Sequence, residues 1–228
     1  FTITPVSTSQ AIVGGVAGVG IGNVGAESAN FKLGVLLKIL GAWLVSPILT
    51  MILAFLTYLL LARLLRRARA IFWSNLMAIA VLASAAYVSY SLGANDVGNA
   101  IGPLLNRFPD KGPHLAVLGG VAMAAGALTF GQRVTNTVGK NIPPLDYTGA
   151  LAAQMSAAFG VHMFSMLGIP VSTSQAVVGG VIGVGLTKGL QAVSTRKIST
   201  IFLGWVITPV CAAIFAAVVY RLLDYALR

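Results

Sequence analysis

Long apolar runs set the pattern of this chain. Three segments, residues 33–62, 71–92 and 198–220, contain a single charged side chain between them, that of Lys38. Because an α-helix rises about 1.5 Å per residue, each segment is long enough to cross a hydrocarbon layer about 30 Å thick. A fourth segment, residues 115–131, is shorter and only marginally long enough. The pattern therefore predicts an all-α membrane protein.

Two further apolar segments, residues 147–167 and 172–186, are separated by the tetrapeptide GIPV. Basic residues flank the pair on both sides, so we expect the chain to return to the side of the membrane from which it started. It can return by two crossings or by a re-entrant hairpin. The second segment spans about 22 Å as a helix, which is short for a crossing. We therefore expect a hairpin whose tip, residues 170–175, stops inside the membrane.

The chain also contains an internal repeat. Residues 5–20 and 170–185 are identical at fourteen of sixteen positions, and both copies begin with PVSTSQ. The likeness continues downstream, because Trp43 and Pro47 follow the first copy as Trp205 and Pro209 follow the second. Internal repeats in strongly apolar chains are typical of secondary transporters, whose two halves each contribute an equivalent element to a shared site.

If the basic junctions all lie on one side of the membrane, the number of crossings between them makes the first hairpin open on the opposite side from the second. The expected fold is therefore an all-α inverted-repeat secondary transporter with re-entrant helical hairpins. Since the first motif follows Phe1 almost at once, we expect the first repeat to be truncated. Residues 1–69 would form the end of the first repeat, from the hairpin tip to a basic loop, and residues 70–228 the second repeat.

Composition and charge agree with this interpretation. With 57% hydrophobic and 9% charged residues and a mean hydropathy of +0.89, the chain has too few charged groups to cover a soluble globule. The net charge of +10 does not indicate nucleic-acid binding, because nine of the fifteen basic residues gather at three junctions, as the positive-inside rule and lipid headgroups favour. These nine are Arg63, Arg66, Arg67, Arg69, Arg133, Lys140, Lys188, Arg196 and Lys197. We expect an integral, multi-pass protein of the plasma (cell inner) membrane.

The repeated motif has the chemistry of an anion site. Pro170 disfavours helix before it, and the Ser and Thr residues that follow are typical of a helix start. The free N–H groups and the positive dipole end of such a helix attract anions, and the hydroxyls and the Gln175 amide add neutral donors. The alternative is that these hydroxyls only cap the helix.

A second polar group, GANDVGNAIGP at residues 93–103, follows an uncharged run. Asp96 is expected at or inside the membrane boundary, where an unpaired carboxylate is costly and usually functional. The three glycines and Pro103 permit an interrupted helix with free carbonyls. The side chains of Asp96, Asn95 and Asn99 and such carbonyls are hard oxygen donors, which suit sodium and are poor ligands for zinc. The alternative is a solvated turn outside the membrane.

Other polar residues point to packing. His162 and Gln154 lie on an apolar segment. We expect a packing or hydrogen-bonding role for His162, with proton relay as the alternative, and an interhelical hydrogen bond for Gln154. Neither His is spaced persuasively beside a nucleophile and no metal-binding cluster occurs, so the chain is not expected to be an enzyme. Cys211 is the single cysteine, which excludes a disulfide framework. The GxxxG pairs Gly14/Gly18 and Gly179/Gly183 indicate close helix contact.

These motifs resemble the inorganic phosphate transporter (PiT) family, whose inverted halves each carry a GAND-type segment and a PVSTS-type hairpin. The resemblance implies cation-coupled phosphate uptake without a resident cofactor, with sodium as the expected cation and protons as the alternative. It implies that phosphate is bound by Ser7, Thr8, Ser9, Gln10, Ser172, Thr173, Ser174, Gln175, Asp96 and Asn99. It implies sodium ligands among Asn95, Asp96, Asn99, Ser9 and Ser174.

The sequence leaves sulfate as one alternative to phosphate as the substrate. Asp96 can accept a hydrogen bond from a phosphate hydroxyl, which sulfate lacks, so phosphate is favoured. A sodium ion beside Asp96 would cancel that difference, and a sulfate permease of the same fold remains the second interpretation. The expected partners are phosphate, sodium and membrane lipids, and a homodimer is left open.

Overall fold

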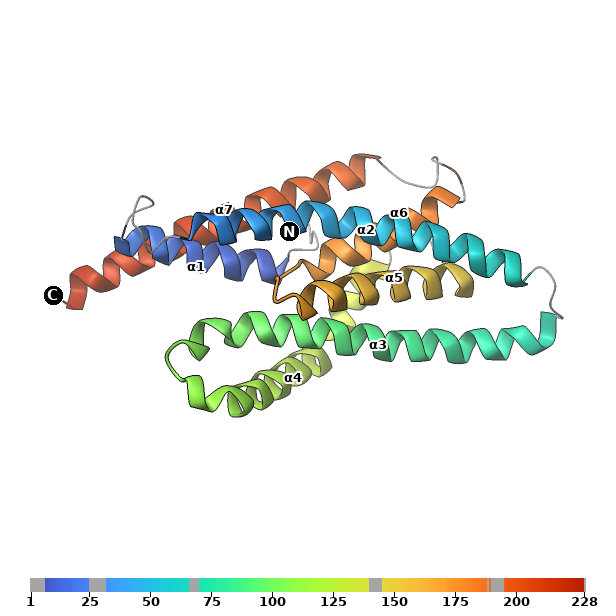
Figure 1. Cartoon of the computed structure of the whole chain (residues 1–228), viewed down its shortest axis with the longest axis horizontal. Coiled ribbons are helices and arrows are strands. Elements are labelled where there is room, and N and C mark those ends of the chain that lie inside the picture. Colours follow the sequence, from blue (N-terminus) through green and yellow to red (C-terminus); the bar gives the residue numbers. More distant parts are fainter. Residues whose placement is uncertain are drawn as a thin grey trace.

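The computed structural model describes residues 7–24, 32–65, 70–139, 145–187, 189 and 195–227. Their secondary structure is helical throughout. The elements are α1 Thr8–Val24, α2 Leu33–Leu65, α3 Ala70–Leu105, η1 Pro109–Lys111, α4 Gly112–Gly139, α5 Tyr147–Met166, α6 Thr173–Thr187 and α7 Thr195–Leu227. Figure 1 shows them as long, roughly aligned rods, with α2 and α7 above and α3 and α4 below.

Four of the described helices are long and apolar enough to cross a membrane: Leu33–Leu65, Asn75–Leu105, Pro109–Gln132 and Ile201–Leu227. The three segments predicted as spans are thereby confirmed, and the marginal segment at residues 115–131 becomes part of a longer span. The large exposed apolar side chains on these helices, such as Leu44, Leu82 and Phe215, are those that lipid would cover.

Helix α3 is uninterrupted through its polar segment. The glycines and Pro103 of the GANDVGNAIGP segment permit an interrupted helix, yet α3 continues without a break to Leu105. A helix pairs its backbone groups internally, and this outweighs the weak helix propensity of glycine in apolar surroundings. Because proline has no N–H, Pro103 still leaves the Asn99 carbonyl without its usual helical donor.

The α5–α6 pair folds as a hairpin. After α5, the N–H groups of Leu167, Gly168 and Ile169 bond back to carbonyls of the last helical turn. Gly168 adopts a left-handed conformation (φ 67°), which favours glycine and ends the helix. The chain then passes through Pro170 and begins α6 at Thr173. The hairpin tip lies near the middle of the molecule's long axis (Figure 1).

The short helices that follow the two motifs pack on long helices far away in the sequence. α1 packs along α7, and α6 packs along α2. A Cβ atom on Gly14 would clash with the carbonyl of Pro209, and one on Gly179 would clash with the carbonyl of Pro47. The close contact predicted from the GxxxG pairs is confirmed, and equivalent glycines of the two motif copies meet equivalent prolines.

The rest of the core lies between α2, α3, α5 and α6. One apolar cluster contains Ala157, Val161 and Phe164 of α5 with Val171 and Ala176 at the start of α6. The Ser84 hydroxyl donates to Gln154 Oε1 (2.6 Å), which confirms the interhelical bond. His162 lies against the rings of Tyr87 and Tyr90, both at 5.8 Å, as expected for a packing role.

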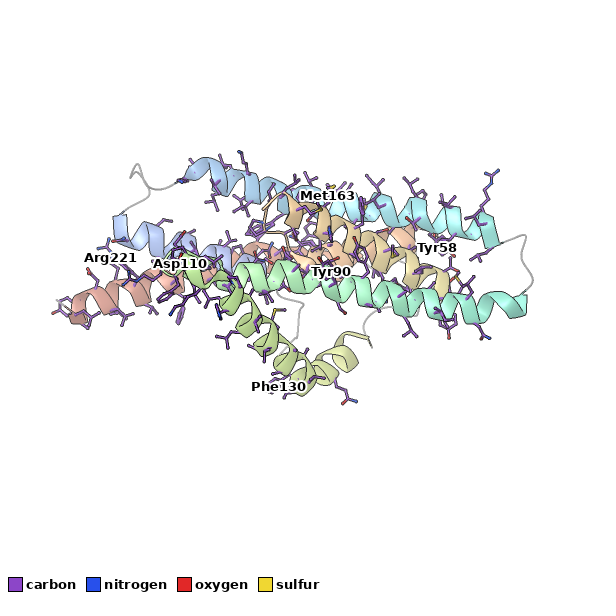
Figure 2. All side chains as sticks on the ribbon, turned by 60° about the horizontal axis from the view of Figure 1, so that its bottom comes forward. Tyr58, Tyr90, Asp110, Phe130, Met163 and Arg221 are labelled. Atoms are coloured by element: carbon purple, nitrogen blue, oxygen red, sulfur yellow. The ribbon has the colours of Figure 1, made fainter. Side chains whose placement is uncertain are left out.

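Helix α4 contacts α3 and otherwise stands apart. Figure 2 shows it leaving the turn at Asp110 and running away from the other helices towards Phe130. Asp110 and Phe130 are both exposed, as is Leu128. α4 therefore leaves the polar centre of the molecule untouched.

Candidate functional site

The two motif copies start their helices in the same way. Gln10 N–H donates to Ser7 Oγ (3.3 Å), and Gln175 N–H donates to Ser172 Oγ (3.2 Å). Both serines are buried N-caps, each satisfying the third N–H of its helix. Ser7 and Ser172 therefore cap their helices, and each hydroxyl oxygen accepts one backbone N–H. Their hydroxyl protons and the positive dipole end of each helix keep the anion-attracting character of each helix start.

The other motif residues differ in exposure. Ser9 is fully buried, Thr8 is exposed, and Thr173 and Ser174 are partly buried. Gln10 and Gln175 are only 1% and 4% exposed, and their Oε1 atoms accept no hydrogen bond from the described part of the chain. Both helix starts therefore present hydroxyl and amide groups and no charged side chain.

Ser9 joins α1 to the polar segment of α3. Asn99 Nδ2 donates to Ser9 Oγ (2.9 Å), and Asn95 Nδ2 approaches the same oxygen at 3.4 Å. The Ser9 side chain also hydrogen-bonds to the Asp96 carboxylate. Asp96 is partly buried and accepts from Asn95 Nδ2 as well (2.9 Å). The Asp96 carboxylate thus accepts hydrogen bonds from two uncharged side chains, and a cation beside it would need oxygens of Asp96 and its neighbours as ligands.

Asn95 also holds the hairpin tip. Its Nδ2 donates to the carbonyl of Val171 (3.1 Å), and Val171 N–H donates to its Oδ1 (3.4 Å). The neighbouring carbonyl of Pro170 accepts from Trp43 Nε1 (3.1 Å). Sequence reasoning did not find the roles of Trp43 and Val171, because their partners lie far away in the chain. The shared Trp-Pro spacing of the two halves was the available signal for Trp43.

The structure therefore brings together Ser9, Asn95, Asp96 and Asn99, and fixes the tip that leads into Ser172 beside them. Thr8 and Gln10 lie on the first turn of α1 with Ser9. Thr173, Ser174 and Gln175 form the first turn of α6. The predicted site residues thus come from two helix starts and one face of α3.

A cavity of about 610 Å³ lies between α2 and α7. Trp43, Trp205, Gln10 and Gln175 contribute to its walls, and the remaining lining residues are apolar or glycine. These walls offer few donors for an oxyanion. The glutamines therefore mark the boundary between this apolar cavity and the polar helix starts.

The amino-acid sequence is similar to those of known membrane transport proteins. The sequence model described as "Phosphate transporter family" matches residues 1–81 and 67–216. A putative phosphate permease of Methanocaldococcus jannaschii is 31% identical over 204 residues, which cover 88% of this chain and 65% of that protein. The sodium-dependent phosphate transporter 2 of Xenopus tropicalis is 34% identical over 153 residues, covering 62% of this chain and 23% of that protein.

The fold is also similar to that of a solved structure. The structure titled "The sodium-dependent phosphate transporter" superimposes with a TM-score of 0.85 at 26% identity, over 97% of this chain and 74% of the other. The chain thus spans about two thirds to three quarters of the length of the Methanocaldococcus relative and of this structure.

Proposed function

Since the chain belongs to the phosphate transporter family, a family of membrane transporters and not of enzymes, we propose that it carries inorganic phosphate across the membrane together with sodium. The chain is an integral, multi-pass membrane protein. The observation that carries the proposal is the meeting of Ser9, Asp96 and Asn99 between a helix start and a membrane-length helix. The names of the sodium-dependent relatives add support for sodium.

The proposed architecture is a pair of inverted repeats, residues 1–69 and 70–228, with a re-entrant hairpin in the second. Three features support it. α1 and α6 both begin near the middle of the molecule and run towards opposite ends, and α2 and α7 run in opposite directions (Figure 1). The equivalent glycines of α1 and α6 meet the equivalent prolines of α7 and α2.

Phosphate is proposed to lie between the two helix starts. Two positive dipole ends face the middle of the molecule, and Thr8, Thr173 and the glutamines offer neutral donors, as do the hydroxyl protons of Ser7 and Ser172. Residues 5–20 and 170–185 contain no Lys or Arg. A carrier must release its substrate, and neutral donors hold an oxyanion less tightly than a fixed cationic clamp.

Sodium is proposed to lie beside Asp96, with Asn99, Ser9 and Ser174 supplying further oxygens. A cation there offsets the cost of a carboxylate inside the membrane and lowers the repulsion between Asp96 and phosphate. Each ligand then strengthens the binding of the other, because a coupling free energy acts equally in both directions. Phosphate rather than sulfate is proposed as the substrate because the family model and the relatives that match the chain are named for phosphate.

Uptake by proteoliposomes tests the proposal. Labelled phosphate should accumulate against its gradient when an inward sodium gradient is imposed, and accumulation should stop when the gradient is removed. A channel would equilibrate phosphate without concentrating it. Accumulation driven by a proton gradient alone would replace sodium by protons, and uptake of labelled sulfate that phosphate does not outcompete would assign the chain as a sulfate permease.

A further inference from the structure

Building on the proposed transport function, we propose that Asn95 is a positioning residue, which fixes the hairpin tip to α3 through the backbone of Val171 and does not coordinate sodium. This assigns to Asn95 a role different from the ligand role that the family resemblance implies. It also identifies Val171 as the backbone position on which the geometry of the second helix start depends.

The contact between Asn95 and Val171 is a two-point pairing. The side-chain amide donates to the Val171 carbonyl at 3.1 Å and accepts from the Val171 N–H at 3.4 Å. It thereby satisfies both backbone polar groups of one residue. Asn95 is 5% exposed and Val171 is 0% exposed, so neither backbone group can turn to solvent instead. Leaving them unpaired would cost about 1–3 kcal/mol per group.

Neighbouring atoms fix the orientation of this amide. Besides the Val171 carbonyl, Nδ2 faces Asp96 Oδ1 at 2.9 Å and Ser9 Oγ at 3.4 Å. Rotating the amide by half a turn would place Oδ1 against the Val171 carbonyl and the Asp96 carboxylate, and Nδ2 against the Val171 N–H. The Val171 carbonyl and the Asp96 carboxylate can only accept, and two such acceptors beside one NH₂ group exclude that arrangement. Oδ1, the one atom of this side chain able to bind a cation, therefore points to the Val171 N–H.

The pairing matters because the hairpin cannot supply hydrogen-bond partners for all the backbone groups of its own tip. Helix α5 uses the N–H groups of residues 167–169, and α6 starts at Thr173. The peptides between these points need partners outside the hairpin. Trp43 of α2 supplies a donor for the Pro170 carbonyl, and Asn95 of α3 supplies both partners for Val171. Ser172, the cap of α6, follows directly, so Asn95 sets the position of that helix start relative to its own neighbour Asp96.

The substitution Asn95→Asp separates the two roles. It keeps the shape and Oδ1 and replaces the NH₂ donor by a second oxygen. A sodium ligand at this position would gain charge, and the sodium concentration for half-maximal uptake would stay the same or fall. A positioning residue would lose its bond to the Val171 carbonyl and set a carboxylate against two acceptors. We expect the maximal uptake rate to fall at least tenfold and not to recover at saturating sodium.

A chemical readout of the tip makes the test independent of transport. In a Val171→Cys variant that also carries Cys211→Ser, because Cys211 is an exposed free thiol, the rate at which a small maleimide labels the introduced thiol reports exposure of the tip. Adding Asn95→Asp or the uncharged Asn95→Ala should raise this rate at least tenfold in monodisperse, detergent-solubilised protein. Asn99→Asp is the matched control, since its amide donates to Ser9 from the same helix, and it should leave the labelling rate within twofold.

The outcomes separate the two proposals. Faster labelling in both Asn95 variants supports the positioning role even if the protein proves not to transport phosphate. Unchanged labelling in both overturns it, as does an Asn95→Ala variant whose uptake recovers fully when sodium is raised, because that result is the signature of a lost ligand.

Discussion

Ser9 shows how fully one hydroxyl group is used at the centre of this molecule. Its oxygen accepts from Asn99 and, at longer range, from Asn95, and its side chain reaches the Asp96 carboxylate. The side chain is fully buried. Any change at this position therefore alters partners that have little access to water.

Ser9→Ala should lower stability as well as transport. It leaves the Asn99 amide without this partner inside the protein, which is expected to lower the free energy of unfolding by about 1–3 kcal/mol. Thermal unfolding in detergent measures the effect. Ser89→Ala is the control, because exposed Ser89 donates only to Ala85 of its own helix, and a change within about 0.5 kcal/mol is expected there. Equal melting temperatures for the two variants would contradict the prediction.

Asp96→Asn should abolish sodium-driven uptake. The substitution removes the negative charge proposed to hold the cation and turns an acceptor into a donor, so we expect uptake to fall at least tenfold. Initial rates in proteoliposomes under a sodium gradient measure this. Asp110→Asn, which changes an exposed carboxylate at the turn between α3 and α4, should keep the full rate. Retained uptake in Asp96→Asn would remove Asp96 from the proposed site.

At the scale of elements, the short helices are defined by their glycines. Gly14 and Gly18 let α1 lie directly on the backbone of α7, and Gly179 and Gly183 let α6 lie on that of α2. Such contact brings backbones close enough for extensive van der Waals packing where no hydrophobic force acts between helices in lipid. Not every glycine does this, since a Cβ atom added at Gly15 would have no neighbour within 4 Å.

Gly14→Ala and Gly15→Ala should therefore have opposite effects. The first forces a methyl group into the Pro209 carbonyl and is expected to destabilise the protein by about 1–3 kcal/mol. The second meets open space and should stabilise the helix by about 0.5–1 kcal/mol, because alanine is the better helix former. Melting temperatures of the two variants test the sign. A fall for Gly15→Ala as large as that for Gly14→Ala would contradict the packing described.

At the scale of the whole molecule, the helices form two groups. α1 pairs with α7, while α2, α3, α5 and α6 pack on one another, and the main contact between the groups is that of α1 with α3. That contact includes Ser9, Asn95 and Asn99. A ligand held there would touch both groups of helices. Its binding free energy would therefore add to the free energy that holds the two groups together.

Sodium and phosphate should therefore stabilise the protein jointly. A ligand present at about 100 times its dissociation constant adds about 2.7 kcal/mol to the free energy of unfolding. Phosphate should raise the melting temperature clearly in sodium and only weakly in an equal concentration of choline. Equal shifts in both salts would show that the two ligands bind independently.

Local signals in the sequence predicted the spans, the hairpin and the serine caps, because length, apolar composition and capping residues act within a few positions. They did not decide the GANDVGNAIGP segment, where glycine and proline permitted a break and α3 is continuous. They also could not name partners across the chain. The pairing of Asn95 with Val171 and the seating of α1 on α7 depend on how distant helices are arranged in space.

The seating of α1 on α7 has a consequence for biosynthesis. Tyr220 donates to Asn23 from 197 residues further along, on a helix that leaves the ribosome long after α1. α6, by contrast, finds α2 already made. Until α7 is synthesised, the glycine face of α1 lacks its main packing partner, so the docking of α1 on α7 is a late event of assembly.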